Sequence, residues 1–128
     1  MLGDISRSLF KKPVTEFYPF QKKPGPDRLR GKLVFDPAKC TGCKICVRDC
    51  PAAAIELHVV DKAAKRFVMT FYTDRCTFCA QCVFSCNFDS LSLSAQEWEL
   101  ASLAREAFKV PCGRPEDIRA MAERPSAG

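Results

Sequence analysis

Eight of the nine cysteines in this 128-residue chain fall into two copies of one spacing, C-x2-C-x2-C-x3-C. The first copy is formed by Cys40, Cys43, Cys46 and Cys50, and the second by Cys76, Cys79, Cys82 and Cys86. A repeated spacing of this kind indicates either a metal-binding framework or a set of disulfides. The fold must therefore bring these sulfurs together.

The spacing is that of cysteines that bind two 4Fe–4S clusters. A cubane takes a thiolate on each of its four irons, and a C-x2-C-x2-C loop offers three of them. The fourth cysteine comes too soon to close the same cube, and in two-cluster ferredoxins it ligates the other cluster. The pattern predicts a first cluster bound by Cys40, Cys43, Cys46 and Cys86, and a second bound by Cys76, Cys79, Cys82 and Cys50.

Zinc and disulfides are the alternative explanations for these cysteines. Structural zinc sites usually combine two CxxC pairs across a longer gap, which would leave the evenly spaced triplets unexplained. Disulfides belong to secreted domains, and residues 1–12 lack the apolar core of a signal peptide. We therefore favour the two clusters. Cys112 has no motif around it, and we interpret it as a free thiol or a packed small side chain.

The cysteine motif is part of a longer internal repeat with an offset of thirty-six residues. Residues 33–57 read LVFDPAKCTGCKICVRDCPAAAIEL, and residues 69–93 read MTFYTDRCTFCAQCVFSCNFDSLSL. In each copy a short apolar stretch precedes the first cysteine and an alternating stretch follows the last, as in half-buried strands. Short helices are expected at 43–49 and 79–85. We predict an α+β, ferredoxin-like dicluster domain whose two halves are related by a pseudo-twofold axis.

Further elements are expected around the repeat. Two β-prone runs, residues 56–60 and 66–72, flank a short polar loop and predict a hairpin. A capping box at residues 94–97 and an apolar stripe through Lys109 predict a helix, and a second short helix is expected at 115–124. The predicted organisation is an extended docking arm (1–31), a two-cluster ferredoxin domain (32–94) and a C-terminal helical extension (95–128).

The net charge of +5 is concentrated in the N-terminal arm, because residues 1–39 contain nine Lys and Arg against four Asp and Glu. Residues 9–20 place large apolar side chains among prolines, which suits an extended peptide that binds another surface. Nucleic acid is a disfavoured partner, because no groove-reading or base-stacking module accompanies the charge. No apolar run is long enough to span a bilayer, and reduced thiols without an export signal indicate the cytoplasm.

The chain resembles the two-cluster ferredoxin subunit of respiratory complex I and of the related membrane-bound, energy-converting NiFe hydrogenases (group 4). The resemblance rests on both cysteine motifs, FKKPVT with Tyr18-Pro19, Arg30-Gly31-Lys32, residues 75–79 and Glu99-Leu100-Ala101. It covers most of the chain, and the short N-terminus favours the hydrogenase type. It implies a peripheral subunit on the cytoplasmic side of the membrane. The implied partners are a catalytic large subunit and a cluster-bearing small subunit, which would provide its contact with the membrane.

The predicted function is electron transfer through two 4Fe–4S clusters within such an oxidoreductase complex. The sequence contains no nucleophile–base pair, no phosphate-binding glycine loop and no open metal position, so no active site of its own is expected. A diffusible two-cluster ferredoxin is the first alternative, against which the apolar arm argues. A zinc-stapled interaction module without redox function is the second.

Overall fold

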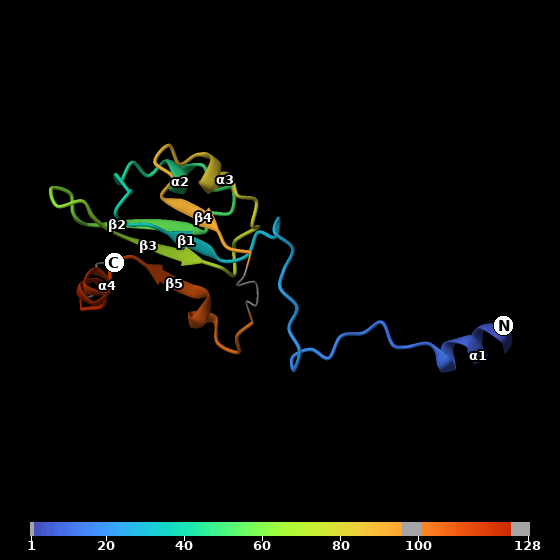
Figure 1. Ribbon diagram of the computed structural model, residues 1–128. Helices are drawn as coiled ribbons and strands as arrows, with labels where there is room; N and C mark the ends of the chain where they lie inside the picture. The colour runs from blue at the N-terminus through green and yellow to red at the C-terminus, as the bar shows by residue number, and fades with distance from the viewer. Residues whose placement is uncertain (1, 96–100, 124–128) are drawn as a thin grey trace.

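The computed structural model describes residues 2–95 and 101–123, which form two small antiparallel sheets with short helices around them (Figure 1). One sheet pairs β1 (Leu33–Phe35) with β4 (Leu91–Leu93), and the other has the order β2 (Ile55–Asp61), β3 (Arg66–Tyr72), β5 (Lys109–Cys112). The helices are α1 (Leu2–Phe10), α2 (Ile45–Arg48), α3 (Gln81–Phe84), the 3₁₀ helix η1 (Arg105–Phe108) and α4 (Pro115–Ala122). The α+β class is confirmed.

The strand pairing follows the internal repeat. β1 and β4 pair Leu33 with Leu93 and Phe35 with Leu91, while β3 and β2 pair Met69 with Leu57 and Phe71 with Ile55. A shift of thirty-six residues converts the first set of pairs into the second. The first strand of each half of the repeat therefore pairs with the second strand of the other half. The strands and the hairpin predicted from residues 56–60 and 66–72 are all present.

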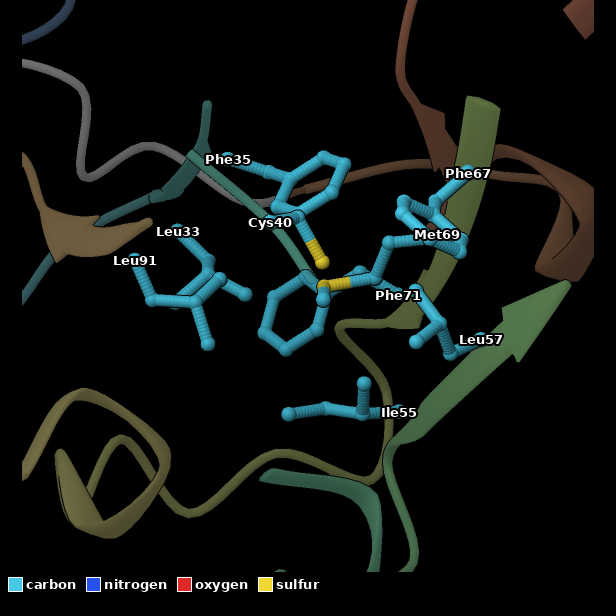
Figure 2. Close-up of a cluster of buried hydrophobic side chains, with 9 residues drawn as sticks. All are labelled: Leu33, Phe35, Cys40, Ile55, Leu57, Phe67, Met69, Phe71 and Leu91. Atoms are coloured by element: carbon cyan, nitrogen blue, oxygen red, sulfur yellow. The ribbon is translucent and has the colours of Figure 1, made fainter. Parts of the chain in front are cut away.

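The hydrophobic core lies between the strands and the cysteine loops (Figure 2). It consists of Leu33, Phe35, Cys40, Ile55, Leu57, Phe67, Met69, Phe71 and Leu91. Most of these residues alternate along their strands, which turns one face of each strand toward the loops. In β3, however, Val68 and Thr70 on the opposite face are also buried. β3 is therefore buried on both faces; in addition, α4 contacts it and β5 pairs along its edge.

The helix predicted from residue 95 to Lys109 is wrong for the residues that the structure describes. Residues 101–104 are irregular, η1 follows, and Lys109 already belongs to β5. The remainder of that helix, residues 96–100, lies outside the described residues. The edge of β3 has unpaired backbone N–H and C=O groups, and β5 forms hydrogen bonds with them. This strand pairing overrides the helical spacing of apolar residues in the sequence of this segment. Pro111, which has no N–H, is tolerated in β5 because this strand lies at the edge of its sheet. The second predicted helix, at 115–124, is present as α4.

The N-terminal arm differs in part from the extended segment expected over residues 1–31. Residues 2–10 form α1, whereas residues 11–32 contain neither helix nor strand, and the arm extends away from the sheets (Figure 1). Its large apolar side chains are exposed, namely Ile5, Leu9, Phe10, Val14, Phe17, Tyr18 and Phe20. The prolines begin only at Pro13, so none of them interrupts the helix at residues 2–10.

Candidate metal centre

Four cysteines from both copies of the motif surround one cavity. Its lining includes Cys40, Cys43, Cys46 and Cys86. Apolar side chains complete the wall, with Leu57 and Met69 contributed by the β2–β3 hairpin and Ile45 by α2. The space measures about 310 Å³, part of which is open to solvent. The sulfur of Cys86 thus lies with the first triplet of cysteines rather than with its own.

A second cavity is lined by the other four cysteines of the two motifs. Its lining includes Cys50, Cys76, Cys79 and Cys82, and its space of about 360 Å³ is likewise partly open to solvent. Leu33, Ile55 and Phe71 close it from the strands. Each of the eight cysteines predicted as ligands therefore lines one of two cavities, and each cavity has three cysteines from one copy of the motif and one from the other. Cys112 is instead half-buried in β5, where it packs against the core.

The two cysteine loops share an unusual backbone conformation. Three pairs of residues that are thirty-six apart all have positive φ: Gly42 and Phe78 (74° and 52°), Lys44 and Ala80 (60° and 66°), Ala53 and Asp89 (46° and 48°). Most side chains disfavour this left-handed region, so repeating it at equivalent positions indicates a shape that both loops require. Such turns direct backbone N–H groups inward, as in anion-binding nests.

Backbone N–H groups already point at the sulfurs. The amide of Phe78 donates to Cys76 Sγ at 3.3 Å, and the amide of Ala54 donates to Cys50 Sγ at the same distance. Arg30 fixes the second loop from outside by donating from Nη1 to the carbonyl oxygen of Cys79 at 2.9 Å. The loops therefore offer hydrogen bonds to negatively charged sulfur, which tune metal clusters.

Burial raises the pKa of four of the cysteine thiols that line the cavities. Burial, followed by the charge of neighbouring thiolates, raises the pKa of Cys46 to about 11 and the pKa of Cys82 to about 11. Burial also raises the pKa of Cys40 and of Cys76. Thiolates gathered in this way repel one another, and positively charged iron between them would offset both the repulsion and the burial.

The eight cysteines are divided between two cavities, four to each, which suits a cluster that takes one thiolate on each iron. Zinc requires four sulfurs about 2.3 Å from a common centre. Two sets of four sulfurs, each around a cavity with an apolar wall, are instead suited to cubanes, whose irons lie at separate corners.

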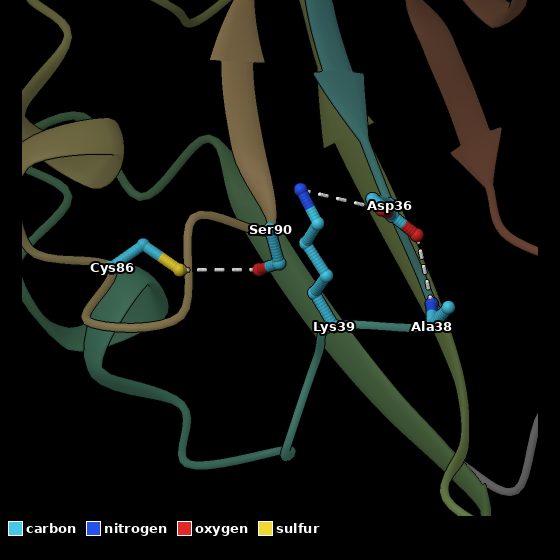
Figure 3. A network of polar contacts seen from close by, with 5 residues as sticks. All are labelled: Asp36, Ala38, Lys39, Cys86 and Ser90. Atoms are coloured by element: carbon cyan, nitrogen blue, oxygen red, sulfur yellow. Dashed lines mark hydrogen bonds and ion pairs between the residues drawn. The ribbon is translucent and has the colours of Figure 1, made fainter.

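Some contacts around the cavities were not anticipated from the sequence. The hydroxyl of Ser90 lies 3.1 Å from Cys86 Sγ, where β4 begins (Figure 3). On the neighbouring segment, Asp36 accepts from the amide of Ala38 at 3.0 Å and lies 3.9 Å from Lys39 Nζ. The equivalent of Ser90 in the first copy is Ala54, and the aligned sequences show this difference but not the contact with Cys86.

Comparison with known proteins agrees with this geometry. Residues 39–90 match a family described as a 4Fe-4S dicluster domain. The matched range contains all eight cysteines of the two cavities, and two 4Fe–4S clusters are therefore the cofactors of this domain.

Relatives align over most of the chain. NADH-quinone oxidoreductase subunit I 2 of Geobacter metallireducens is 34% identical over 109 residues, which cover 80% of this chain and 82% of that protein. NAD(P)H-quinone oxidoreductase subunit I of Gloeobacter violaceus is 36% identical over 107 residues, covering 78% of this chain. The aligned part is 49% of the Gloeobacter protein, so the chain spans about half the length of that relative.

A solved structure has a similar fold over nearly the whole chain. It belongs to the membrane-bound sulfane sulfur reductase, described as an archaeal respiratory membrane complex. The superposition has a TM-score of 0.68 at 30% sequence identity and covers 97% of this chain and 69% of the other. In the part of the chain that the structure describes, no helix is long and apolar enough to cross a membrane.

Proposed function

Because the chain belongs to the family of NADH-quinone oxidoreductase subunit I, we propose that it relays single electrons through two 4Fe–4S clusters inside a larger oxidoreductase complex. One observation carries the proposal: each cavity is lined by four cysteines, three from one copy of the motif and one from the other. Each bound cluster supplies a one-electron couple. The chain itself contributes ligands, hydrogen bonds and an apolar wall.

The ligand assignment that we propose is crosswise. Cys40, Cys43, Cys46 and Cys86 bind one cluster, and Cys76, Cys79, Cys82 and Cys50 bind the other. The grouping of these residues around two cavities supports it, as does the equivalent strand register of the two halves. The same register supports a pseudo-twofold relation between residues 33–57 and 69–93.

The remaining cavity residues exclude water and hold the loops. Met69 and Leu57 cover one cavity, and Phe71 and Ile55, their neighbours along the same hairpin, cover the other. A single hairpin thus contributes to both walls. Burial and hydrogen bonds to sulfur are the two properties through which a protein sets cluster potentials.

We further propose that the arm of residues 1–31 attaches the two-cluster domain to partner subunits. Its apolar side chains are exposed, and its basic residues outnumber its acidic ones. A large catalytic subunit and a small subunit with another cluster are the proposed partners, on the cytoplasmic side of a membrane. The likeness to a subunit of the sulfane sulfur reductase complex supports a membrane-associated assembly, with membrane contact through partners. We also propose residues 95–128 as a C-terminal extension of the two-cluster domain, in which β5 pairs with β3 and α4 contacts β3.

The test is anaerobic purification of the tagged full chain from its native host. The proposal expects it to elute with a large, membrane-derived complex and to contain two cubanes per copy of this chain. Elution as a small single polypeptide with both clusters would identify a diffusible ferredoxin. Zinc in place of iron would identify an interaction module.

The same preparation tests the crosswise ligands through serine variants, since serine keeps an oxygen ligand and marks its cluster by a changed EPR signal. Cys50→Ser and Cys76→Ser should alter one signal, and Cys86→Ser and Cys40→Ser the other. Cys112→Ser is the matched control and should alter neither. If Cys50→Ser and Cys40→Ser alter the same signal, the crosswise assignment is wrong.

A further inference from the structure

The two cavities have the same backbone but differ in one hydroxyl. Ser90 and Ala54 are thirty-six residues apart, at the point where each fourth-cysteine loop enters a strand. The carbonyl oxygen of Ser90 accepts from the amide of Asp36 at 2.8 Å, and that of Ala54 accepts from the amide of Tyr72 at 2.8 Å. Asp36 and Tyr72 are also thirty-six residues apart. The backbone around both positions is therefore equivalent, and only the side chain differs.

The hydroxyl of Ser90 is held against a cysteine sulfur. Its oxygen lies 3.1 Å from Cys86 Sγ, and the residue is only 5% exposed (Figure 3). Between a thiol and a hydroxyl, either atom can donate. A thiolate that ligates iron has no proton, so in the loaded protein the hydroxyl must donate to the sulfur.

We propose that Ser90 raises the reduction potential of the cluster ligated by Cys86 and thereby makes the two clusters unequal electron acceptors. The inference rests on the crosswise ligands proposed above. Reduction increases the negative charge on the ligating sulfurs, and a hydrogen bond donated to one of them favours the reduced state. Ala54 has no hydroxyl to offer Cys50, so the second cluster lacks this contribution. Ser90 is a positioning residue, since it acts through Cys86.

The structure offers a reciprocal pair of variants. Ser90→Ala removes the hydroxyl beside Cys86, and Ala54→Ser introduces one at the equivalent place beside Cys50. Both are measured on the full chain with its clusters, isolated anaerobically, by EPR-monitored redox titration. Ser90→Ala should decrease the equilibrium constant for reduction of one cluster roughly three- to tenfold, the effect of one ordinary hydrogen bond. A tenfold change in a one-electron couple corresponds to about 59 mV.

Ala54→Ser should increase the reduction equilibrium constant of the other cluster, so the two variants move different signals in opposite directions. Ser90→Thr keeps the hydroxyl and should restore the original potential. Iron and sulfide analysis of the same samples separates the two proposals. If every variant contains two cubanes but neither potential changes, the inference about Ser90 is overturned while the proposed function stands. If the unaltered chain contains fewer than two cubanes, the proposed function itself fails.

Discussion

Gly42 lies in the first cysteine loop, and the ring of Phe67 occupies the space beside it. Its φ is +74°, and an added Cβ would lie 2.4 Å from Cε1 of Phe67. The equivalent residue of the second loop is Phe78, which has a side chain at a similar φ of 52°. The left-handed backbone alone therefore does not demand glycine here. The buried ring of Phe67, which fills the core under the first loop, does.

We predict that Gly42→Ala destabilises the loaded protein by about 2–4 kcal/mol, through the left-handed backbone and the overlap with a packed ring. Anaerobic urea unfolding, followed by the cluster absorbance, measures the change. Gly3→Ala is the control, because an added Cβ at Gly3 meets no atom within 4 Å. Equal unfolding midpoints for Gly42→Ala and the unaltered chain would contradict this account.

At the residue scale, the sequence identified all eight cysteines that line the cavities. A short loop can place sulfurs around one centre only with a narrow choice of spacings, so the pattern carries the geometry. Ser90 was not identified, because its contact with Cys86 depends on how the chain turns into β4. Cys112, which lies outside both motifs, packs against the core from β5.

Among the elements, α4 is attached to β3 by an ion pair that sequence patterns did not indicate. Asp117, in the first turn of α4, is fully buried and accepts from Arg66 Nε at 2.6 Å. A second, closer contact joins Arg66 Nη2 to the same carboxylate oxygen. The Asp117 carboxylate raises the pKa of the Arg66 guanidinium, first through this hydrogen bond. The pair ties the C-terminal helix to the strand that forms the centre of the three-stranded sheet.

We predict that Asp117→Ala destabilises the protein by about 1–3 kcal/mol. The value is below that for a fully buried pair, because Arg66 keeps partial access to solvent. Hydrogen exchange should accelerate in β5 and α4, whereas the EPR signals of the clusters should stay unchanged. Glu116→Ala, in the same turn but exposed, is the matched control and should change stability by less than about 0.5 kcal/mol. Loss of cluster signals in Asp117→Ala alone would show that α4 supports the cysteine loops directly.

Element prediction succeeded where local patterns and tertiary contacts agree. The hairpin of β2 and β3 followed from its alternation and its polar loop. β5 was not predicted, because the apolar residues of this segment recur at helical spacing. The segment forms a strand because it pairs with the edge of β3, which is distant in the sequence. α1 was not predicted, because the prolines that follow it favour an extended arm.

At the scale of the whole molecule, we expect the bound clusters to stabilise the fold by linking the two halves of the repeat. The core is small, and its nine buried residues include Cys40, a proposed ligand. Iron bound between the thiolates would offset their burial and mutual repulsion, so we expect iron binding and folding to be coupled. Small domains of this kind rarely reach stability by apolar burial alone.

We predict that removing iron with a chelator under reducing, anaerobic conditions unfolds both sheets together. The near-ultraviolet circular dichroism should be lost, and cysteine alkylation should proceed to completion. Reconstitution with iron and sulfide should restore the dichroism and the visible absorbance in parallel. An iron-free chain that keeps its tertiary dichroism would show that the apolar core suffices.

The exchange of strands between the halves has a consequence for how the chain could be divided. Each half of the repeat contributes one strand to the β1–β4 ladder and one strand to the β2–β3 ladder. In both ladders the partner strand comes from the other half. A chain severed between β2 and β3 would therefore consist of two peptides that must associate to form any β1–β4 or β2–β3 ladder. Their relation is that of protomers in a dimer, joined in this protein by the short turn between Asp61 and Arg66.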